Sequence, residues 1–166
     1  MKQFCLTVVL TITISLFDGI GTTTRAGDAV TPVLRGLKEV SVHVEDLDFR
    51  FERAGLTVDH LRTDAEFKLT QAGIKVQSKK ESTRLESPQL HIVIKVLRTS
   101  SGDYAAHLRL ELREAVGLVR HPGMEVFAST WTTGKFGVTQ SLSEVRKQEQ
   151  TMLDTFIKEY QAANPN

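Results

Sequence analysis

The chain contains little cysteine, few aromatic side chains and no apolar run long enough to cross a membrane. Its 166 residues include one cysteine, Cys5, and aromatic side chains make up 7% of the total. A disulfide scaffold needs paired cysteines, and a membrane-spanning helix needs about 20 consecutive apolar residues. The formal net charge of +1 also lacks the basic excess typical of proteins that bind nucleic acid. We therefore expect one ordinary packed domain, with no disulfide and no nucleic-acid partner.

The first 26 residues have the layout of a secretory signal peptide. Met1-Lys2 is a short basic start, residues 4–17 are apolar, and Thr24-Arg25-Ala26 fits a cleavage site. An uncleaved membrane anchor is the alternative, but Asp18 ends the apolar run well short of a bilayer span. Cys5 lies at the start of the apolar run, whereas the acceptor cysteine of a lipoprotein would follow the run.

Removal of this leader would leave a neutral domain without cysteine. Lys2, Arg25 and Asp18 would be lost with it, which leaves 19 basic and 19 acidic residues. We expect a periplasmic or secreted protein with no membrane span after leader removal, stabilised by packing alone. The expected plan is a signal peptide at 1–26, a tether at 27–36, a single α/β domain at 37–161 and a tail at 162–166. The sequence leaves the oligomeric state open.

Two runs of alternating apolar and polar residues, 90–97 and 106–113, predict a β-hairpin about the turn at 99–103. A register that pairs Leu97 with Ala105 makes one face aliphatic and the other polar, as in a sheet covered on one side. The other predicted pairs are Ile92–Leu110, Ile94–Leu108, Lys95–His107, Val93–Arg109 and His91–Glu111. Glu114 interrupts the aliphatic series and predicts a bulge or bend near residues 113–115.

The remaining patterns complete an order of β-α-(short β)-β-β-β-α. A strand is expected at 39–45, a charged connection at 46–54, a polar loop at 77–88 and a third meander strand at 125–133. Gly134 and Gly137 then predict a turn or flexible loop. Thr57 as N-cap and Gly73 as stop delimit one helix, and the capping box of Ser141 and Glu144 begins the last. The predicted fold is α+β, a two-layer α/β sandwich of one mainly antiparallel sheet with both helices on one face.

This order resembles the amino-terminal domain of TolB over about residues 37–161. The resemblance lies in the strand, the helix ending in Ala72-Gly73-Ile74-Lys75-Val76, the three-strand meander and the last helix. It implies a fold and, more weakly, a binding role. Four segments are also similar to a family of small secreted bacterial proteins without assigned function, which implies export and no particular chemistry. They are Leu34-Arg35-Gly36-Leu37, Ala72-Gly73-Ile74, Thr130-Trp131-Thr132-Thr133-Gly134 and Phe156-Ile157-Lys158-Glu159-Tyr160.

No stretch carries a catalytic signature. The sequence contains no G-x-S-x-G elbow and no phosphate-binding loop, and the only cysteine lies in the leader. We therefore expect no enzyme and no cofactor. A weaker alternative is a divalent-metal cluster of His43, His91, His107 and Glu111 on the polar face of neighbouring strands. Its simpler explanation is a set of solvated side chains, with His91 and Glu111 as an ordinary cross-strand pair.

The polar face also carries apolar groups of the types that anchor protein contacts. The predicted interaction face consists of His43, Val93, Arg109, Phe127 and Trp131. The alternative is that the loops at 46–54 or 77–88 bury Phe127 and Trp131, or that the register of that strand is off by one. The expected function is a non-enzymatic envelope module that binds a protein or another envelope component through this face or an open sheet edge. The alternative is a periplasmic protein that binds a small ligand or metal ion through the histidines.

Overall fold

The computed structural model describes residues 31–77 and 87–165. The predicted signal peptide, the first part of the predicted tether and most of the polar loop at 77–88 lie outside the described residues. In chain order the elements are η1 (Thr31–Leu34), β1 (Glu39–Val44), α2 (Phe49–Arg53), α3 (Val58–Gln71), β2 (Lys75–Val76), β3 (Gln89–Arg98), β4 (Tyr104–Gly117), β5 (Glu125–Thr139) and α4 (Leu142–Ala163).

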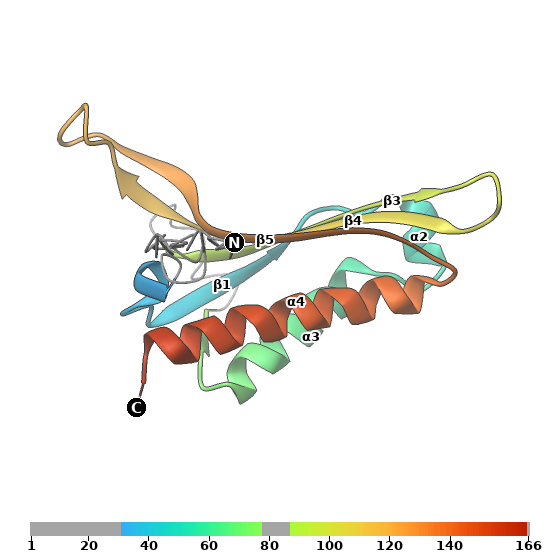
Figure 1. Ribbon diagram of the computed structural model, residues 1–166, viewed down its shortest axis with the longest axis horizontal. Helices are drawn as coiled ribbons and strands as arrows, with labels where there is room; N and C mark the ends of the chain where they lie inside the picture. Colours follow the sequence, from blue (N-terminus) through green and yellow to red (C-terminus); the bar gives the residue numbers. More distant parts are fainter. Residues whose placement is uncertain (1–30, 78–86, 166) are drawn as a thin grey trace, which may run out of the picture.

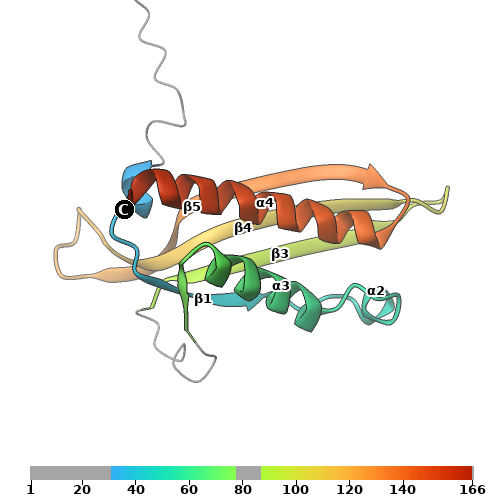
Figure 2. The same ribbon diagram turned by 90° about the horizontal axis from the view of Figure 1, so that it is seen from below.

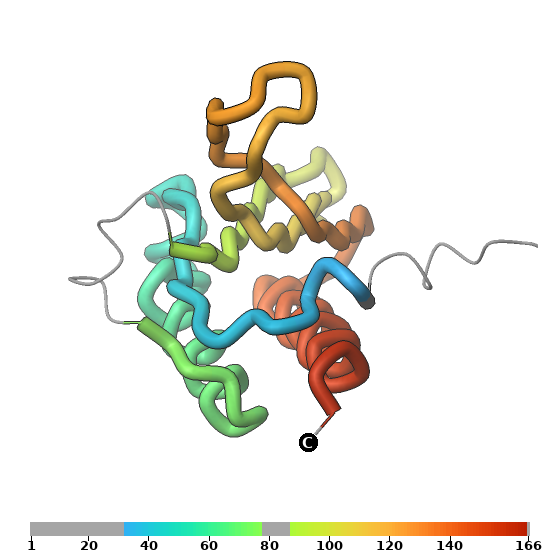
Figure 3. Tube along the Cα trace, turned by 90° about the vertical axis from the view of Figure 1, so that its left-hand side faces the viewer, coloured from blue at the N-terminus to red at the C-terminus, as the bar shows by residue number. Residues whose placement is uncertain are grey.

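The strands form one five-stranded sheet in the order β2-β1-β3-β4-β5. β1 runs parallel to β2 and β3, whereas β3, β4 and β5 form an antiparallel meander. The two long helices, α3 and α4, lie side by side along the same face of the sheet (Figures 1 and 2). An end-on view shows the two layers, with the helices on one side of the strands (Figure 3). The predicted α+β sandwich is therefore confirmed.

The hairpin register agrees with the prediction at every pair. Leu97 faces Ala105, Ile92 faces Leu110 and Ile94 faces Leu108. Ile92, Leu110, Ile94 and Leu108 are at most 3% exposed and pack against the helices, because alternate side chains of both strands point to the same face. The core also includes Leu61, Ala65 and Leu69 of α3 and Val145, Leu153 and Phe156 of α4.

Both long helices begin at the predicted caps, and α3 ends at the predicted glycine. The Thr57 hydroxyl accepts a hydrogen bond from the amide of His60, and the Ser141 hydroxyl accepts one from the amide of Glu144. Gly73 adopts a φ of +80°, and Ile74 N–H then donates to the Leu69 carbonyl at 3.0 Å. This arrangement satisfies the carbonyls at the end of α3 and needs a residue that tolerates a left-handed backbone.

Two connections are more ordered than predicted. Residues 46–54 are not wholly an exposed connection, since Asp48 caps the short helix α2 and Phe51 is buried. Part of the predicted tether forms η1, whose Leu34 is fully buried. Asn164, predicted to lie in a tail, accepts from Gly36 N–H and donates to the Leu34 carbonyl, which joins the two ends of the domain.

β5 is longer than predicted and contains the bulge. It continues through Gly134 and Gly137 to Thr139, so the turn expected there is wrong. The register shifts between Leu112 and Arg113 of β4, which leaves Thr130 of β5 as the extra residue. Beyond it, the ends of β4 and β5 form a two-stranded ribbon that projects from the body (Figure 1). Within residues 31–77 and 87–165, no helix is long and apolar enough to cross a membrane.

Candidate functional site

The face of the sheet opposite α3 and α4, which we call the open face, carries the candidate site. Its side chains form rows across β3, β4 and β5, because residues paired in register point to the same face. The first row, beside the turn at 99–103, contains Leu97, Ala105 and Val138, and the second contains Lys95, His107 and Phe136. Val93 and Arg109 follow, and then His91, Glu111 and Thr132, with His43 of β1 beside His91.

The half of the open face nearer β1 is a polar cluster centred on Glu111. The Glu111 carboxylate accepts from Arg109 Nε at 2.9 Å and from Ser129 Oγ at 3.0 Å. Glu111 is 8% exposed, and these two donors compensate its burial. Lys95 pairs with Glu45 at 2.6 Å farther along the same face. Most charges in this half therefore already have partners.

His91 is the unsatisfied member of this cluster. Its ring stacks at a tilt on His43, with centroids 5.1 Å apart, and its Nδ1 lies 3.8 Å from Glu111 Oε2. That separation is too long for a hydrogen bond, and Nδ1 is buried with no partner among the described residues. Burial lowers the pKa of His91, and nearby His43 and Arg113 lower it further, against the opposing effect of Glu111 and Glu45. The fold therefore favours the neutral imidazole.

The half of the open face nearer the turn at 99–103 is apolar and exposed. Leu97, Phe136 and Val138 are 70%, 72% and 62% exposed, and they occupy adjacent rows on β3 and β5, the two strands that flank β4. Ala105 lies between Leu97 and Val138. We call these four residues the apolar end. Large apolar side chains gathered on one exposed surface are typical of a contact site.

Of the five residues predicted for the interaction face, four lie on the open side of the sheet. These are His43, Val93, Arg109 and, on the projecting ribbon, Phe127, but Val93 is only 4% exposed. Its neighbours along and across the strands, including Arg109 and Lys95, have long side chains that shield it. Val93 therefore packs beneath these longer side chains and offers a partner little exposed surface.

Trp131 lies on the opposite face, and its predicted place is wrong. The bulge at Thr130 shifts the alternation of β5 by one residue, so Trp131 pairs with the core residue Leu112. Trp131 is 4% exposed, and its indole N–H donates to Glu159 of α4 at 2.6 Å. The possibility of a register off by one in this strand is therefore the one that the structure bears out, and α4 covers the ring.

Phe127 lies on the projecting ribbon, away from the other candidates. It pairs with Ala115 and is half-buried, and the Arg113 guanidinium lies 5.2 Å from the centre of its ring. This cation–π contact shields one side of the ring. Phe127 is therefore separated along the sheet from the apolar end.

The alternative metal cluster is not assembled. His91 and Glu111 are paired, but His107 lies four residues along β4 from Glu111, a distance of about 13 Å for an extended strand. Across the part of the chain that the structure describes, no group of three histidine, cysteine, aspartate or glutamate side chains is arranged to hold a metal ion.

Phe136 and Val138 are the site residues that sequence reasoning missed. Two glycines in five residues suggested a turn, and this hid the strand that continues to Thr139. The alternation of Phe136, Gly137 and Val138 was the available signal that the strand continues. The length of β4 was a second signal, because the backbone groups along its whole edge need a partner strand.

A buried carboxyl group between the helices was missed as well. Glu149 of α4 is 2% exposed, and neither carboxyl oxygen has a hydrogen-bond partner among the described residues. Burial raises its pKa to about 8, Asp64 and Asp154 act in the same direction, and Lys68 and Arg146 oppose them. Glu149 occupies a core position of α4 between Val145 and Met152. The burial of this carboxyl group without a hydrogen-bond partner therefore destabilises the helix layer.

Comparison with known proteins assigns no family. No family model matches the chain, and no curated protein matches it. Among solved structures, a minor lipoprotein from Acinetobacter baumannii is 14% identical with a TM-score of 0.32, covering 76% of this chain and 93% of its own. The rare lipoprotein B from Shewanella oneidensis is 15% identical with a TM-score of 0.27, covering 75% and 89%. These likenesses are too low to argue from, and they confirm neither resemblance predicted from the sequence.

Proposed function

We propose that this chain is an exported, non-enzymatic binding module of the bacterial cell envelope, which contacts a partner protein through the open face of its sheet. The observation that carries the proposal is the apolar end, where Leu97, Phe136 and Val138 stay exposed on the face that the helices leave uncovered. Export is supported by the leader predicted at residues 1–26.

The chemistry of the surface supports a protein partner. Removing a large apolar side chain from water contributes about 1.5–3 kcal/mol, so the apolar end can supply the centre of an interface. Lys95, His107 and Arg109 border it on the same face, and polar groups at the rim of an interface fix orientation and partner choice. An apolar centre with a polar rim is the composition that specific protein–protein interfaces have.

A photo-crosslinking pair tests this function. A benzoylphenylalanine side chain is placed at Phe136 in one strain and at Phe67 in the other. Both are exposed phenylalanines, at 72% and 61%, but Phe67 lies on α3 in the helix layer. The proposal expects one discrete protein adduct from position 136, none from position 67, and loss of the adduct when Val138→Ser is added. Equal adducts from both positions, or none from position 136, would count against it.

A further inference from the structure

Among the described residues, β4 extends beyond the end of β3 on the side remote from the apolar end. β3 pairs with β4 only as far as Gln89 and Arg113, and Pro88 precedes the first residue of β3. β4 continues to Gly117 and pairs there with β5 on one side. On its other side, residues 114–117 of β4 have no neighbouring strand among the described residues. Within residues 31–77 and 87–165, the outward backbone groups of this stretch form a short free edge.

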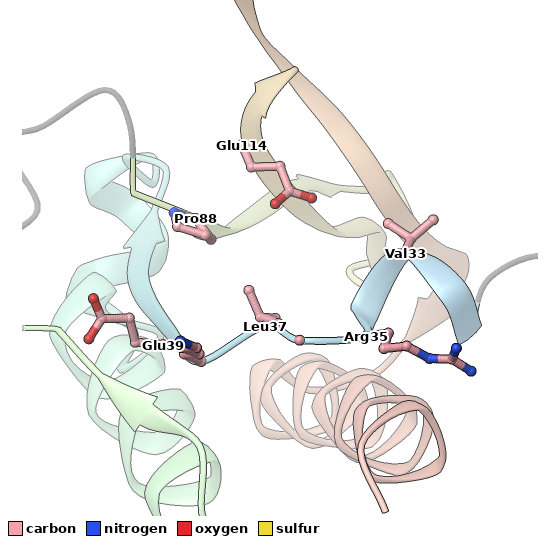
Figure 4. A pocket seen from close by; sticks show the side chains of 8 residues that line it. Val33, Arg35, Leu37, Glu39, Pro88 and Glu114 are labelled. Carbon is pink, nitrogen blue, oxygen red and sulfur yellow. The ribbon is translucent and has the colours of Figure 1, made fainter. Parts of the chain in front are cut away.

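A hollow of about 300 Å³ lies beside this free edge. Its lining consists of Val33, Arg35, Gly36, Leu37, Lys38, Glu39, Pro88 and Glu114. Figure 4 shows that Glu114 hangs from β4 into the hollow, with Leu37 and Pro88 across from it. The volume is at the lower limit for a ligand site and suits one or two side chains.

Glu114 supplies the negative charge on the β4 side of the hollow, and Lys38, which also lines the hollow, forms no ion pair with it within the described residues. The Arg35 side chain points away, and Glu39 is turned toward the other side of β1 (Figure 4), where it accepts from Gln77 at 2.6 Å and pairs with Lys75 at 2.7 Å. Glu114 accepts a hydrogen bond from Thr130 Oγ1 at 2.6 Å and forms no ion pair within the described residues. A carboxylate with one neutral donor retains capacity for a cation.

The backbone groups of residues 114–117 and the side chain of Glu114 together indicate which kind of partner segment fits this edge. We propose that an extended segment of a partner protein adds to β4 along residues 114–117, in the place that β3 leaves empty, with a lysine or arginine opposite Glu114. A residue directly opposite Glu114 would point to the same face and so into the hollow. There its aliphatic stem contacts Leu37 and Pro88 while its cationic group meets the carboxylate. Strand addition to an open edge supplies the backbone hydrogen bonds.

This is a second site, separate from the apolar end and additional to the proposed function. The rows that contain Phe136 and Glu114 lie at opposite ends of β4, whose paired positions run from Tyr104 to Gly117. A partner that used both sites would contact the sheet along its full length. Either site can also act alone, so each has its own test.

The probe is a fluorescent nine-residue peptide of alternating threonine and valine with one central lysine. It is titrated into the exported protein, labelled with ¹⁵N, and followed by anisotropy and by amide chemical shifts. Two matched peptides carry a central glutamate or methylated backbone nitrogens. Glu114→Gln removes the proposed charge, and Glu125→Gln removes a charge from the same ribbon, opposite Gly117, as the control.

The expected result is binding of the lysine peptide with shifts at residues 114–117, weakened about tenfold or more by Glu114→Gln and unchanged by Glu125→Gln. Both matched peptides should bind less tightly. Equal affinity for the lysine and glutamate peptides, or no binding, overturns the proposal. Shifts at Lys95 and Phe136 instead of residues 114–117 overturn it too, while they support the open face as a binding surface. A peptide bound at Glu114 with no crosslink from position 136 would defeat the proposed function alone.

Discussion

Trp131 and Phe156 meet edge to face between the sheet and α4, with ring centroids 5.0 Å apart and an interplanar angle of 69°. The contact fixes the position of α4 on the sheet, because Phe156 is fully buried and Trp131 also bonds to Glu159 of the same helix. Trp131 is the only tryptophan of the chain, so its fluorescence reports on this junction. The edge-to-face geometry adds to the energy of burying both rings.

We expect Trp131→Ala to cost about 3–5 kcal/mol of unfolding free energy, because it leaves a cavity above Phe156. Trp131→Phe keeps a ring and loses the hydrogen bond to Glu159, at a cost of about 1–3 kcal/mol. Urea unfolding followed by circular dichroism measures both. If Trp131→Ala were as stable as the parent protein, the ring could not be packed under α4.

The contribution of Glu149 to the stability of the protein is expected to fall as the pH rises from about 4.5 to about 8. Glu149 has a folded pKa raised to about 8 from an ordinary value of 4.5, so the folded state holds a proton that the unfolded state has lost in this range. Below this window both states are protonated and no penalty exists. Above it both are ionised and the penalty is complete.

Glu149→Gln keeps the shape without the ionisation and should flatten this pH profile. Glu149→Met should also be more stable than the parent by about 1–3 kcal/mol at pH 8, because it fills an apolar position between Val145 and Met152. Urea unfolding at several pH values measures the slope. Glu66→Gln, a half-exposed carboxylate on α3, is the control and should leave the slope unchanged. Parallel profiles for Glu149→Gln and the parent would contradict the assignment.

Asn164 is expected to hold the two ends of the domain together. Its side chain donates to the carbonyls of Leu34 and Tyr160, both at 2.9 Å, and accepts from Gly36 N–H at 2.7 Å. Asn164→Ala should cost about 1–2 kcal/mol and speed hydrogen exchange at the Gly36 amide. Gln161→Ala, an exposed change in the last turn of α4, serves as the comparison. Unchanged exchange at Gly36 in Asn164→Ala would show that this bridge is not formed.

Zinc is expected to leave the thermal stability unchanged. His43, His91 and Glu111 lie near one another, but His107 is displaced along β4. No three of these side chains are arranged to hold a metal ion within the described residues. A ligand that binds only the folded state raises the midpoint of unfolding, so calorimetry with and without zinc decides the matter. A rise that His91→Gln abolishes would restore the metal-binding alternative.

The sequence contained enough information for the hairpin and the helix ends, because local rules determine them. Alternation on both strands and a short turn allow one register between Leu97 and Ala105, and the caps at Thr57 and Ser141 act within a single turn. The parallel neighbours of β1 depend on long-range packing, so no local pattern predicted them.

The candidate site was harder to predict, because single residues determine which side chains face the open side of the sheet and which face the core. One bulge at Thr130 reverses the faces of β5 and moves Trp131 into the core. Gly134 and Gly137 resemble a turn, yet they lie in a strand whose partner β4 holds them extended. Glu149 interrupts the apolar stripe of α4, and no local pattern indicates that this charged residue is buried.

The most direct test of the binding function compares affinities once the adduct at position 136 identifies a partner. Calorimetry with the purified partner should give a dissociation constant at least about tenfold weaker for Phe136→Ser combined with Val138→Ser, since two exposed anchors of the apolar end are lost. Phe67→Ser combined with Phe49→Ser removes two comparably exposed anchors outside the open face and should leave the constant unchanged. Equal affinity of the first pair and the parent protein would contradict the proposal that the open face makes the contact.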